Sequence, residues 1–327
     1  MTTHPPLPSI IPLDAVLAAR TRLLGTVVRT PVVALSHDAA TPDIRLKLEN
    51  LQPIGSFKMR GAGNAMRAMA PAALADGVWT ASAGNMAQGV AWCAREMHVA
   101  CTVVVPEHAP RAKTDAVERL GGRIVRRPFE AWWQLLVDRG DDSMVGRFIH
   151  PVSDADVMAG NATVALEILE DVPDVSAIVV PYGGGGLSCG IASAVRHLAP
   201  HVKVFAADVS TAAPLAPALA AGGPVATSYA PSFVDGIGGR TVLAEMWPLA
   251  STLLDGSLVV SPGQVAEAWR LVLLRSRVLA EGAGAAAVAA ALTLGEAGIA
   301  DGPIVAVVSG GNIDPGVVVR LLQGDLP

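Results

Sequence analysis

Three short segments carry residue types that could perform chemistry together. Lys58 lies in the segment 56–61, Ser-Phe-Lys-Met-Arg-Gly, and is one of only four lysines in the chain. The segment 81–89 reads Ala-Ser-Ala-Gly-Asn-Met-Ala-Gln-Gly, and the segment 181–187 reads Pro-Tyr-Gly-Gly-Gly-Gly-Leu. An amine can react with an aldehyde, a small polar loop can bind a carboxylate, and consecutive glycines can direct backbone N–H groups at a phosphate. Together they suit a cofactor that carries both an aldehyde and a phosphate.

Lys58 has an ordinary explanation as well as a chemical one. It could be a surface lysine near the start of a helix, with Ser56 as the N-cap. Schiff-base chemistry instead needs a neutral amine, and a desolvated pocket at a helix N-terminus lowers the pKa of an ammonium group. Phe57 either packs on the core or borders that pocket. Because the other two segments are present, we favour the covalent cofactor link, with Phe57 beside it.

The glycine run follows an apolar segment and precedes a predicted helix. Taken alone it could be a flexible turn, but this position lets backbone N–H groups and the helix dipole act on one anion. The run lacks the lysine-Ser/Thr ending of a P-loop and the spacing of GxGxxG. We therefore predict that a cofactor phosphate is bound by Gly183, Gly184, Gly185, Gly186 and Leu187.

Short β-branched runs alternate with alanine-rich stretches. The predicted strands are Ile44–Leu48, Val78–Ala81, Cys101–Val105, Ile178–Val180, Val202–Ala206 and Ile304–Val308. The predicted helices are Asn85–Met97, Arg111–Leu120, Asp156–Glu170 and Leu187–Leu198. This alternation predicts an α/β fold with a mostly parallel sheet and helices on both faces. Such sheets bind ligands beyond the carboxyl ends of their strands, where the asparagine loop and the glycine run both fall.

The three segments resemble those of the fold type II pyridoxal-phosphate enzymes, the tryptophan synthase β-like family. Within it they most resemble the threonine/serine dehydratase and serine racemase branch, from roughly Arg29 to Asn312. The resemblance implies pyridoxal 5′-phosphate as cofactor, an amino acid as substrate and a homodimer. It also implies two domains, each a mostly parallel sheet flanked by helices. The large cofactor-binding domain would comprise residues 1–76 plus 151–327, and a small domain, residues 77–150, would carry the substrate-carboxylate loop.

The resemblance also implies roles for single residues. Lys58 would be the catalytic residue, Asn85 would touch the 3′-oxygen of the cofactor, and Ser309 would meet its pyridine nitrogen. Asn85 could also cap the helix that follows it. The implied substrate-binding residues are Ser82, Ala83, Gly84, Asn85, Met86 and Gly236. Met86 replaces the usual histidine, and Glu281 is carried over as a further candidate although the motif around it departs from the family pattern.

The expected reaction follows from Ser309. A hydroxyl beside the pyridine nitrogen, in place of a carboxylate, makes the ring a milder electron sink, which suits prompt loss of a β-leaving group better than transamination. The resemblance therefore implies β-elimination of water from L-threonine- or L-serine-like amino acids, giving a 2-oxo acid and ammonia.

Four alternatives compete with this dehydratase activity. Racemisation needs a second base, and Ala83 stands where family racemases carry a serine. β-Replacement enzymes usually carry Thr-Ser-Gly-Asn-Thr-Gly in the asparagine loop, unlike this chain. A cofactor-binding sensor without turnover would not need Lys58, Asn85 and Ser309 together. Finally, Trp132-Trp133 either packs a helix of the small domain or narrows the pocket and favours a bulkier β-hydroxy amino acid such as phenylserine.

Composition excludes other classes of protein. The chain has 327 residues, is 51% hydrophobic and 16% charged, and carries a formal net charge of −5, which is typical of a densely packed α/β protein. No Lys/Arg run has nucleic-acid-binding density, so we expect no nucleic-acid partner. Arg123, Arg126 and Arg127 instead indicate a solvated strand edge.

Cysteine usage and apolar runs predict the compartment. Cys93, Cys101 and Cys189 are odd in number and form no CxxC motif, which favours buried, reduced thiols. The N-terminus shows no secretion signal, and the longest apolar runs, such as Ile304–Val308, are strand-sized. We expect a cytoplasmic protein without a membrane partner.

No metal site is expected. The seven histidines show no ligand spacing for zinc. Several enzymes of the resembled family bind a divalent cation beside the phosphate loop, at positions that correspond to Asp208, Ala212 and Pro214. Proline supplies no side-chain oxygen, and magnesium and calcium need several hard oxygen ligands.

Overall fold

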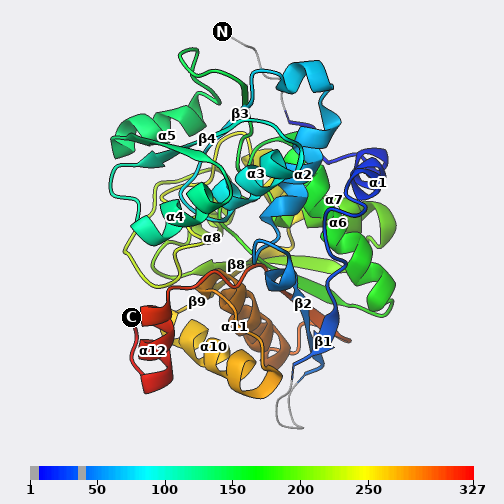
Figure 1. The fold of residues 1–327 in the computed structure, drawn as a ribbon. Coiled ribbons are helices and arrows are strands. Elements are labelled where there is room, and N and C mark those ends of the chain that lie inside the picture. The colour runs from blue at the N-terminus through cyan, green and yellow to red at the C-terminus, as the bar shows by residue number, and fades with distance from the viewer. Residues whose placement is uncertain (1–6, 36–41) are drawn as a thin grey trace.

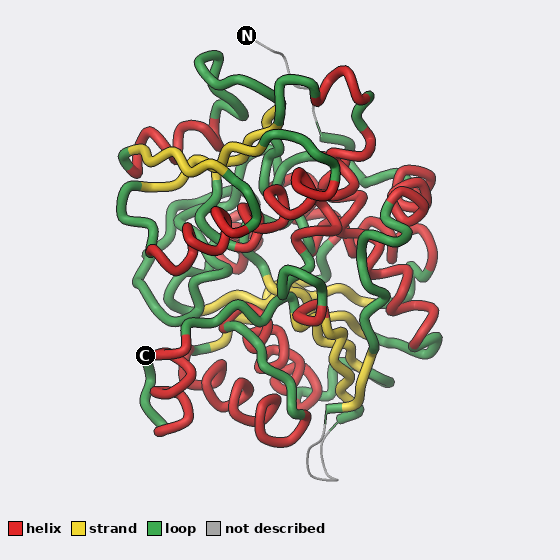
Figure 2. Tube along the Cα trace, viewed as in Figure 1, coloured by secondary structure: helices red, strands yellow, loops and turns green. Residues whose placement is uncertain are grey.

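The strands form two separate sheets (Figures 1 and 2). The computed structural model describes residues 7–35 and 42–327. In spatial order, the larger sheet contains β1 (Val32–Ala34), β2 (Ile44–Leu48), β10 (Ile304–Val308), β7 (Ala177–Pro181), β8 (Lys203–Val209) and β9 (Gly256–Val260). The smaller sheet contains β5 (Arg123–Arg127), β4 (Cys101–Pro106), β3 (Val78–Ala81) and β6 (Arg147–Phe148). Among these strands only β1 and β2 pair antiparallel, so the predicted mostly parallel α/β fold is confirmed.

Helices connect the strands in the manner of parallel sheets. In chain order the described helices are α1 (Leu13–Arg22), η1 (Glu49–Leu51), α2 (Lys58–Ala68), η2 (Pro71–Leu74), α3 (Asn85–Glu96), α4 (Arg111–Arg119), α5 (Phe129–Val137), α6 (Ala155–Asp171), α7 (Ser188–Leu198), α8 (Leu215–Ala221), α9 (Trp247–Leu253), α10 (Pro262–Ser276), α11 (Gly282–Glu296) and α12 (Pro315–Gln323). Each strand and helix predicted above coincides with one of these elements. The largest difference is in β8, which continues to Val209 because that residue still pairs with Val260 of β9.

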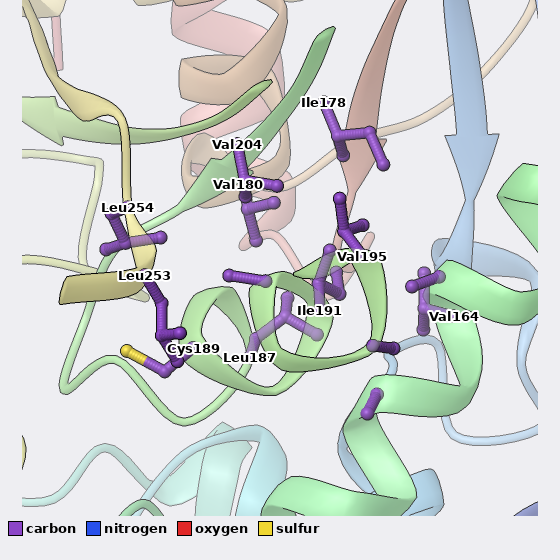
Figure 3. Close-up of a cluster of buried hydrophobic side chains, with 14 of the residues drawn as sticks. Val164, Ile178, Val180, Leu187, Cys189, Ile191, Val195, Val204, Leu253 and Leu254 are labelled. Atoms are coloured by element: carbon purple, nitrogen blue, oxygen red, sulfur yellow. The ribbon is translucent and has the colours of Figure 1, made fainter. Parts of the chain in front are cut away.

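The central strands β7 and β10 of the larger sheet are buried on both faces because they are apolar throughout. Successive side chains of a strand point to opposite faces. Ile178 and Val180 of β7 therefore join one hydrophobic cluster and Val179 joins the other. Figure 3 shows the first cluster, where Ile178, Val180 and Val204 lie over α7. The alanine-rich helix α11 packs against the opposite face.

The smaller sheet follows the same rule. Val103 and Val105 of β4 pack on the side of α3, whereas Val104 packs with Trp79 in a cluster that includes α5. All of its strands fall within residues 77–150, the predicted small domain, and that division of the chain stays a prediction. β5 lies at the sheet edge with its three arginines exposed, as expected for a solvated edge.

Cys93, Cys101 and Cys189 are buried free thiols, which confirms the prediction made for them. Burial raises the pKa of each thiol to about 12, so these cysteines are poor nucleophiles. None of the helices in the described part of the chain has the length and apolar character needed to cross a bilayer.

Candidate active site

The loops singled out from the sequence meet at one cavity of about 370 Å³. They follow the carboxyl ends of β3, β7 and β10, the expected ligand position in a parallel sheet. The cavity is lined by every predicted cofactor- and substrate-binding residue: Phe57, Lys58, Ser82, Ala83, Gly84, Asn85, Met86, Gly183, Gly184, Gly185, Gly186, Leu187, Gly236, Glu281 and Ser309. The fold thus brings the whole predicted set together, and the role of each residue stays a prediction.

Lys58 is the first residue of α2, and its amine faces the cavity. Its Nζ donates a hydrogen bond to the carbonyl oxygen of Pro151 at 2.9 Å and lies 5.2 Å from the centre of the Phe57 ring. Burial lowers the pKa of Lys58 to about 8, and the carboxylate of Glu281 opposes that shift. The neutral amine that nucleophilic and base chemistry require is therefore far more populated near pH 7 than in an ordinary lysine, at roughly a tenth of the molecules.

Ser56 is not the N-cap of α2, so this part of the ordinary explanation for Lys58 is wrong. Phe57 occupies the N-cap position of α2, and no side chain caps this helix. Ser56 instead forms an isolated bridge with Gly310, and its buried hydroxyl has no hydrogen-bond partner among the described residues. The backbone N–H of Phe57 donates to the carbonyl of Ser309 at 3.0 Å. Pairing with the segment after β10, rather than local capping, therefore sets where α2 begins.

A buried network of charges anchors α2 close to Lys58. Arg60 donates to Glu49 and to Glu167, each at 2.7 Å, and Lys47 pairs with Glu167 at 2.5 Å. Burial alone would raise the pKa of Glu49, but the Arg60 guanidinium holds it below its ordinary value. Two cations and two carboxylates balance, so the network joins α2 to β2 and α6 without net charge.

The glycine loop forms a cradle in which Gly184 and Gly186 have no room for a side chain. A Cβ atom on Gly184 would lie 2.6 Å from a methyl carbon of Val152, and one on Gly186 would lie 2.7 Å from the Val152 carbonyl oxygen. The backbone can therefore approach this closely only as glycine. The eleven-residue helix α7 begins directly after the loop. Bare backbone and a helix N-terminus fit a phosphate group.

Asn85 contacts two segments far from it in sequence. Its Nδ2 donates to both carboxylate oxygens of Glu281, at 2.9 and 3.0 Å, and its Oδ1 accepts from Asn312 at 2.8 Å. The suggestion that Asn85 caps a helix is wrong, because Gly84 is the N-cap of α3 and no side chain caps it. Burial raises the pKa of Glu281 to about 7, while the hydrogen bonds from Asn85 act against this rise.

Comparisons with known proteins agree with this geometry. The profile of the family described as pyridoxal-phosphate dependent enzyme matches residues 23–310. The chain belongs to this family. The resemblance inferred from the three segments and the predicted cofactor are both confirmed, since the family depends on pyridoxal phosphate.

Individual relatives of this pyridoxal-phosphate-dependent enzyme match over most of its length. An L-threonine ammonia-lyase of Geobacter sulfurreducens is 38% identical over 309 residues, which are 93% of this chain and 76% of the relative. A putative threonine dehydratase of Sinorhizobium fredii is 33% identical over 97% of this chain and 96% of its own. The structure of maize serine racemase is similar with a TM-score of 0.85 at 30% identity, covering 95% and 97% of the two chains.

The residues present fit pyridoxal phosphate. The glycine cradle suits its phosphate, Lys58 supplies an amine for its aldehyde, and the hydroxyl of Ser309 lies in the same cavity. When bound, the cofactor withdraws electrons from the α-carbon of an amino acid and so makes the α-proton acidic.

Several cavity residues escaped sequence analysis. Lys113 of α4 lies 2.6 Å from the carboxylate of Asp235, and Pro151 and Val152 line the cavity between β6 and α6. No motif marks them, because their place depends on how the two sheets pack.

Of the tryptophan pair, only Trp132 lines the cavity. It also packs on the cluster around Trp79, as expected for a residue that packs a helix of the smaller sheet, while the preference for a bulkier substrate stays a prediction.

Asp208, which corresponds to a cation-binding position of the resembled family, is buried in β8. Its carboxylate accepts from Ser257 Oγ at 2.7 Å and from the backbone N–H of Leu215 at 3.2 Å. Burial raises the pKa of Asp208 to about 6. Pro214 is the N-cap residue of α8, and the expectation that no cation binds here stays a prediction.

Proposed function

We propose that this enzyme eliminates water from L-threonine- or L-serine-like β-hydroxy amino acids and releases a 2-oxo acid and ammonia. The observation that carries the proposal is the Lys58 amine of lowered pKa, which faces the same cavity as the asparagine loop and the glycine cradle. The names of the relatives, L-threonine ammonia-lyase and putative threonine dehydratase, support it.

Each group has a proposed task in this reaction. Backbone N–H groups of the loop 82–86 hold the substrate carboxylate, and Lys58 Nζ takes the proton from Cα. The Cβ–O bond breaks as the Cα–Cβ double bond forms, and the hydroxyl takes up a proton, which balances the one that Lys58 removed from Cα, and leaves as water. The released unsaturated amine then takes up water in solution to give the 2-oxo acid and ammonia, so the atoms balance.

Racemisation is the main competing proposal, because racemases are among the similar structures. It requires a second proton acceptor on the opposite face of Cα. The methyl group of Ala83, which lines the cavity, cannot accept a proton. We therefore favour elimination over racemisation.

We further propose that the enzyme acts as a homodimer in the cytoplasm. The buried, unpaired cysteines support a reducing compartment. The homodimer rests on the family resemblance, and sedimentation analysis of the purified protein tests it. A monomer that retains full activity would contradict it.

The proposed reaction is tested by measuring 2-oxo acid release from a panel of L- and D-β-hydroxy amino acids. We expect turnover of L-threonine or L-serine, and we expect Lys58→Ala to lose it by several orders of magnitude while the protein stays folded. An enzyme that binds the cofactor covalently but turns over no member of the panel would indicate a binding protein instead.

A further inference from the structure

Trp132 contributes to the wall of the active-site cavity, and the proposed reaction gives it no task. Trp132 lies on α5, lines the cavity and packs with its inner edge on the Trp79 cluster. Its neighbour Trp133 does not line the cavity and is 38% exposed. The two tryptophans therefore differ in environment although they are adjacent on one helix.

Trp132 is held directly beside the asparagine loop. Its indole Nε1 donates to the carbonyl oxygen of Val104 at 3.1 Å, and the backbone N–H of Ser82 donates to the same oxygen at 3.1 Å. Because one oxygen accepts both bonds, the indole nitrogen and the first residue of the loop must be close neighbours. The polar edge of the indole is satisfied by this bond, so the surface that it offers to the cavity is carbon.

The paired charges that line the cavity also favour a ligand whose β-substituent is uncharged. Lys113 and Asp235 line the same cavity, and their charges balance in an ion pair at 2.6 Å. A second carboxylate on a substrate would have to compete with Asp235 for Lys113. Burial of a charge beside an apolar surface without its own partner is unfavourable.

We infer that Trp132 is a specificity-determining residue for a β-hydroxy amino acid whose Cβ carries an uncharged, apolar group larger than methyl, such as a phenyl ring. This inference rests on the proposed elimination reaction and specifies its substrate class. The substrate carboxylate is held by the loop 82–86, and the apolar β-substituent packs on the indole beside that loop.

The test compares Trp132→Ala with Trp133→Ala, which removes the same side chain one residue away and outside the cavity. The kcat/KM values for phenylserine, threonine and 3-hydroxyaspartate are measured with the cofactor-loaded enzyme. We expect wild type to prefer phenylserine, and the phenylserine-to-threonine ratio to fall about tenfold in Trp132→Ala, as expected for loss of one aromatic contact. Trp133→Ala should keep the wild-type ratio.

A binding measurement separates this inference from the proposed reaction. L-Phenylalanine and L-alanine lack the leaving hydroxyl, and their affinities for the loaded enzyme are compared by titration calorimetry. Tighter binding of phenylalanine that is lost in Trp132→Ala supports the apolar wall, even if no panel member is turned over and the elimination proposal fails. Equal affinities, a preference for threonine or 3-hydroxyaspartate, or an equal effect of both tryptophan variants would overturn the inference.

Trp132→Phe covers the case in which the alanine variant unfolds. It keeps an aromatic ring, although a smaller one that lacks the bond to Val104, so it should retain most of the preference for phenylserine. Complete loss of that preference in a folded Trp132→Phe protein would contradict packing on the ring.

Discussion

The side-chain amide nitrogen of Asn85 donates to both carboxylate oxygens of Glu281, 196 residues away along the chain, at 2.9 and 3.0 Å. This contact joins the start of α3, which follows the smaller sheet, to the start of α11, which packs on the larger sheet. The same carboxylate acts on Lys58 and partly offsets the lowering of its pKa. Glu281 therefore couples the asparagine loop to the reactive amine.

The lowered pKa of Lys58 predicts its reactivity. In cofactor-free protein, the rate at which an amine-acylating reagent modifies Lys58 should rise as the pH is raised through about 8 and level off above it, because only the neutral amine reacts. Peptide mass spectrometry measures the rate at each site, with the exposed Lys203 as an internal control. If Lys58 and Lys203 show the same pH dependence, the environment of Lys58 does not lower its pKa.

Replacement of Glu281 should shift this profile. Glu281→Gln keeps the shape of the side chain and an oxygen that can accept from Asn85, but it removes the negative charge that favours protonated Lys58. The midpoint of the Lys58 modification profile should therefore move to lower pH, by about half a unit to one unit for a partly screened charge. A midpoint that moves upward would show that the two groups do not interact as described.

The Ala83→Ser variant tests how the reaction is restricted to elimination. A serine hydroxyl at this position, where family racemases carry serine, would supply a second proton acceptor in the cavity. We expect measurable racemisation of serine by chiral chromatography, while 2-oxo acid release continues. Ala83→Val adds bulk without an acceptor and should not racemise. Racemisation by wild type as fast as its elimination would refute the one-base mechanism.

The buried network around Arg60 should contribute strongly to stability. Arg60→Met leaves Glu49 and Glu167 buried with Lys47 as the one remaining cation of the network. The free energy of unfolding should therefore fall by about 3 to 5 kcal/mol. Urea unfolding followed by circular dichroism measures this loss. The exposed pair of Arg95 and Glu96 offers a control, since Arg95→Ala should change stability by less than about 1 kcal/mol. Comparable losses in both variants would mean that burial of the network is unimportant.

Removal of metal ions should leave the enzyme active. Asp208 supplies one carboxylate, but Pro214 supplies no side-chain oxygen where family members use an acidic residue. The rate of 2-oxo acid release should therefore be unchanged after exhaustive treatment with a chelator. Loss of activity that magnesium or calcium restores would show that other oxygen atoms complete a cation site.

The sequence by itself determined the parts of this protein that depend on local patterns. Short β-branched and apolar runs located the strands β2, β3 and β10 at their observed bounds. The glycine run and the lysine segment identified the cradle and Lys58, because both depend on residue type and on position next to a strand or helix. Each of these signals is contained in a few consecutive residues, so it can be recognised without knowledge of packing.

Only the tertiary structure decided which distant side chains meet. Asn85 contacts Glu281 instead of capping α3, and Lys113 reaches Asp235, because the two sheets pack with their loops facing one cavity. The sequence marked Trp132 and Trp133 as a pair, yet consecutive residues on a helix point in directions about 100° apart. Which of them faces the cavity depends on how α5 is rotated against the smaller sheet, and long-range contacts set that rotation.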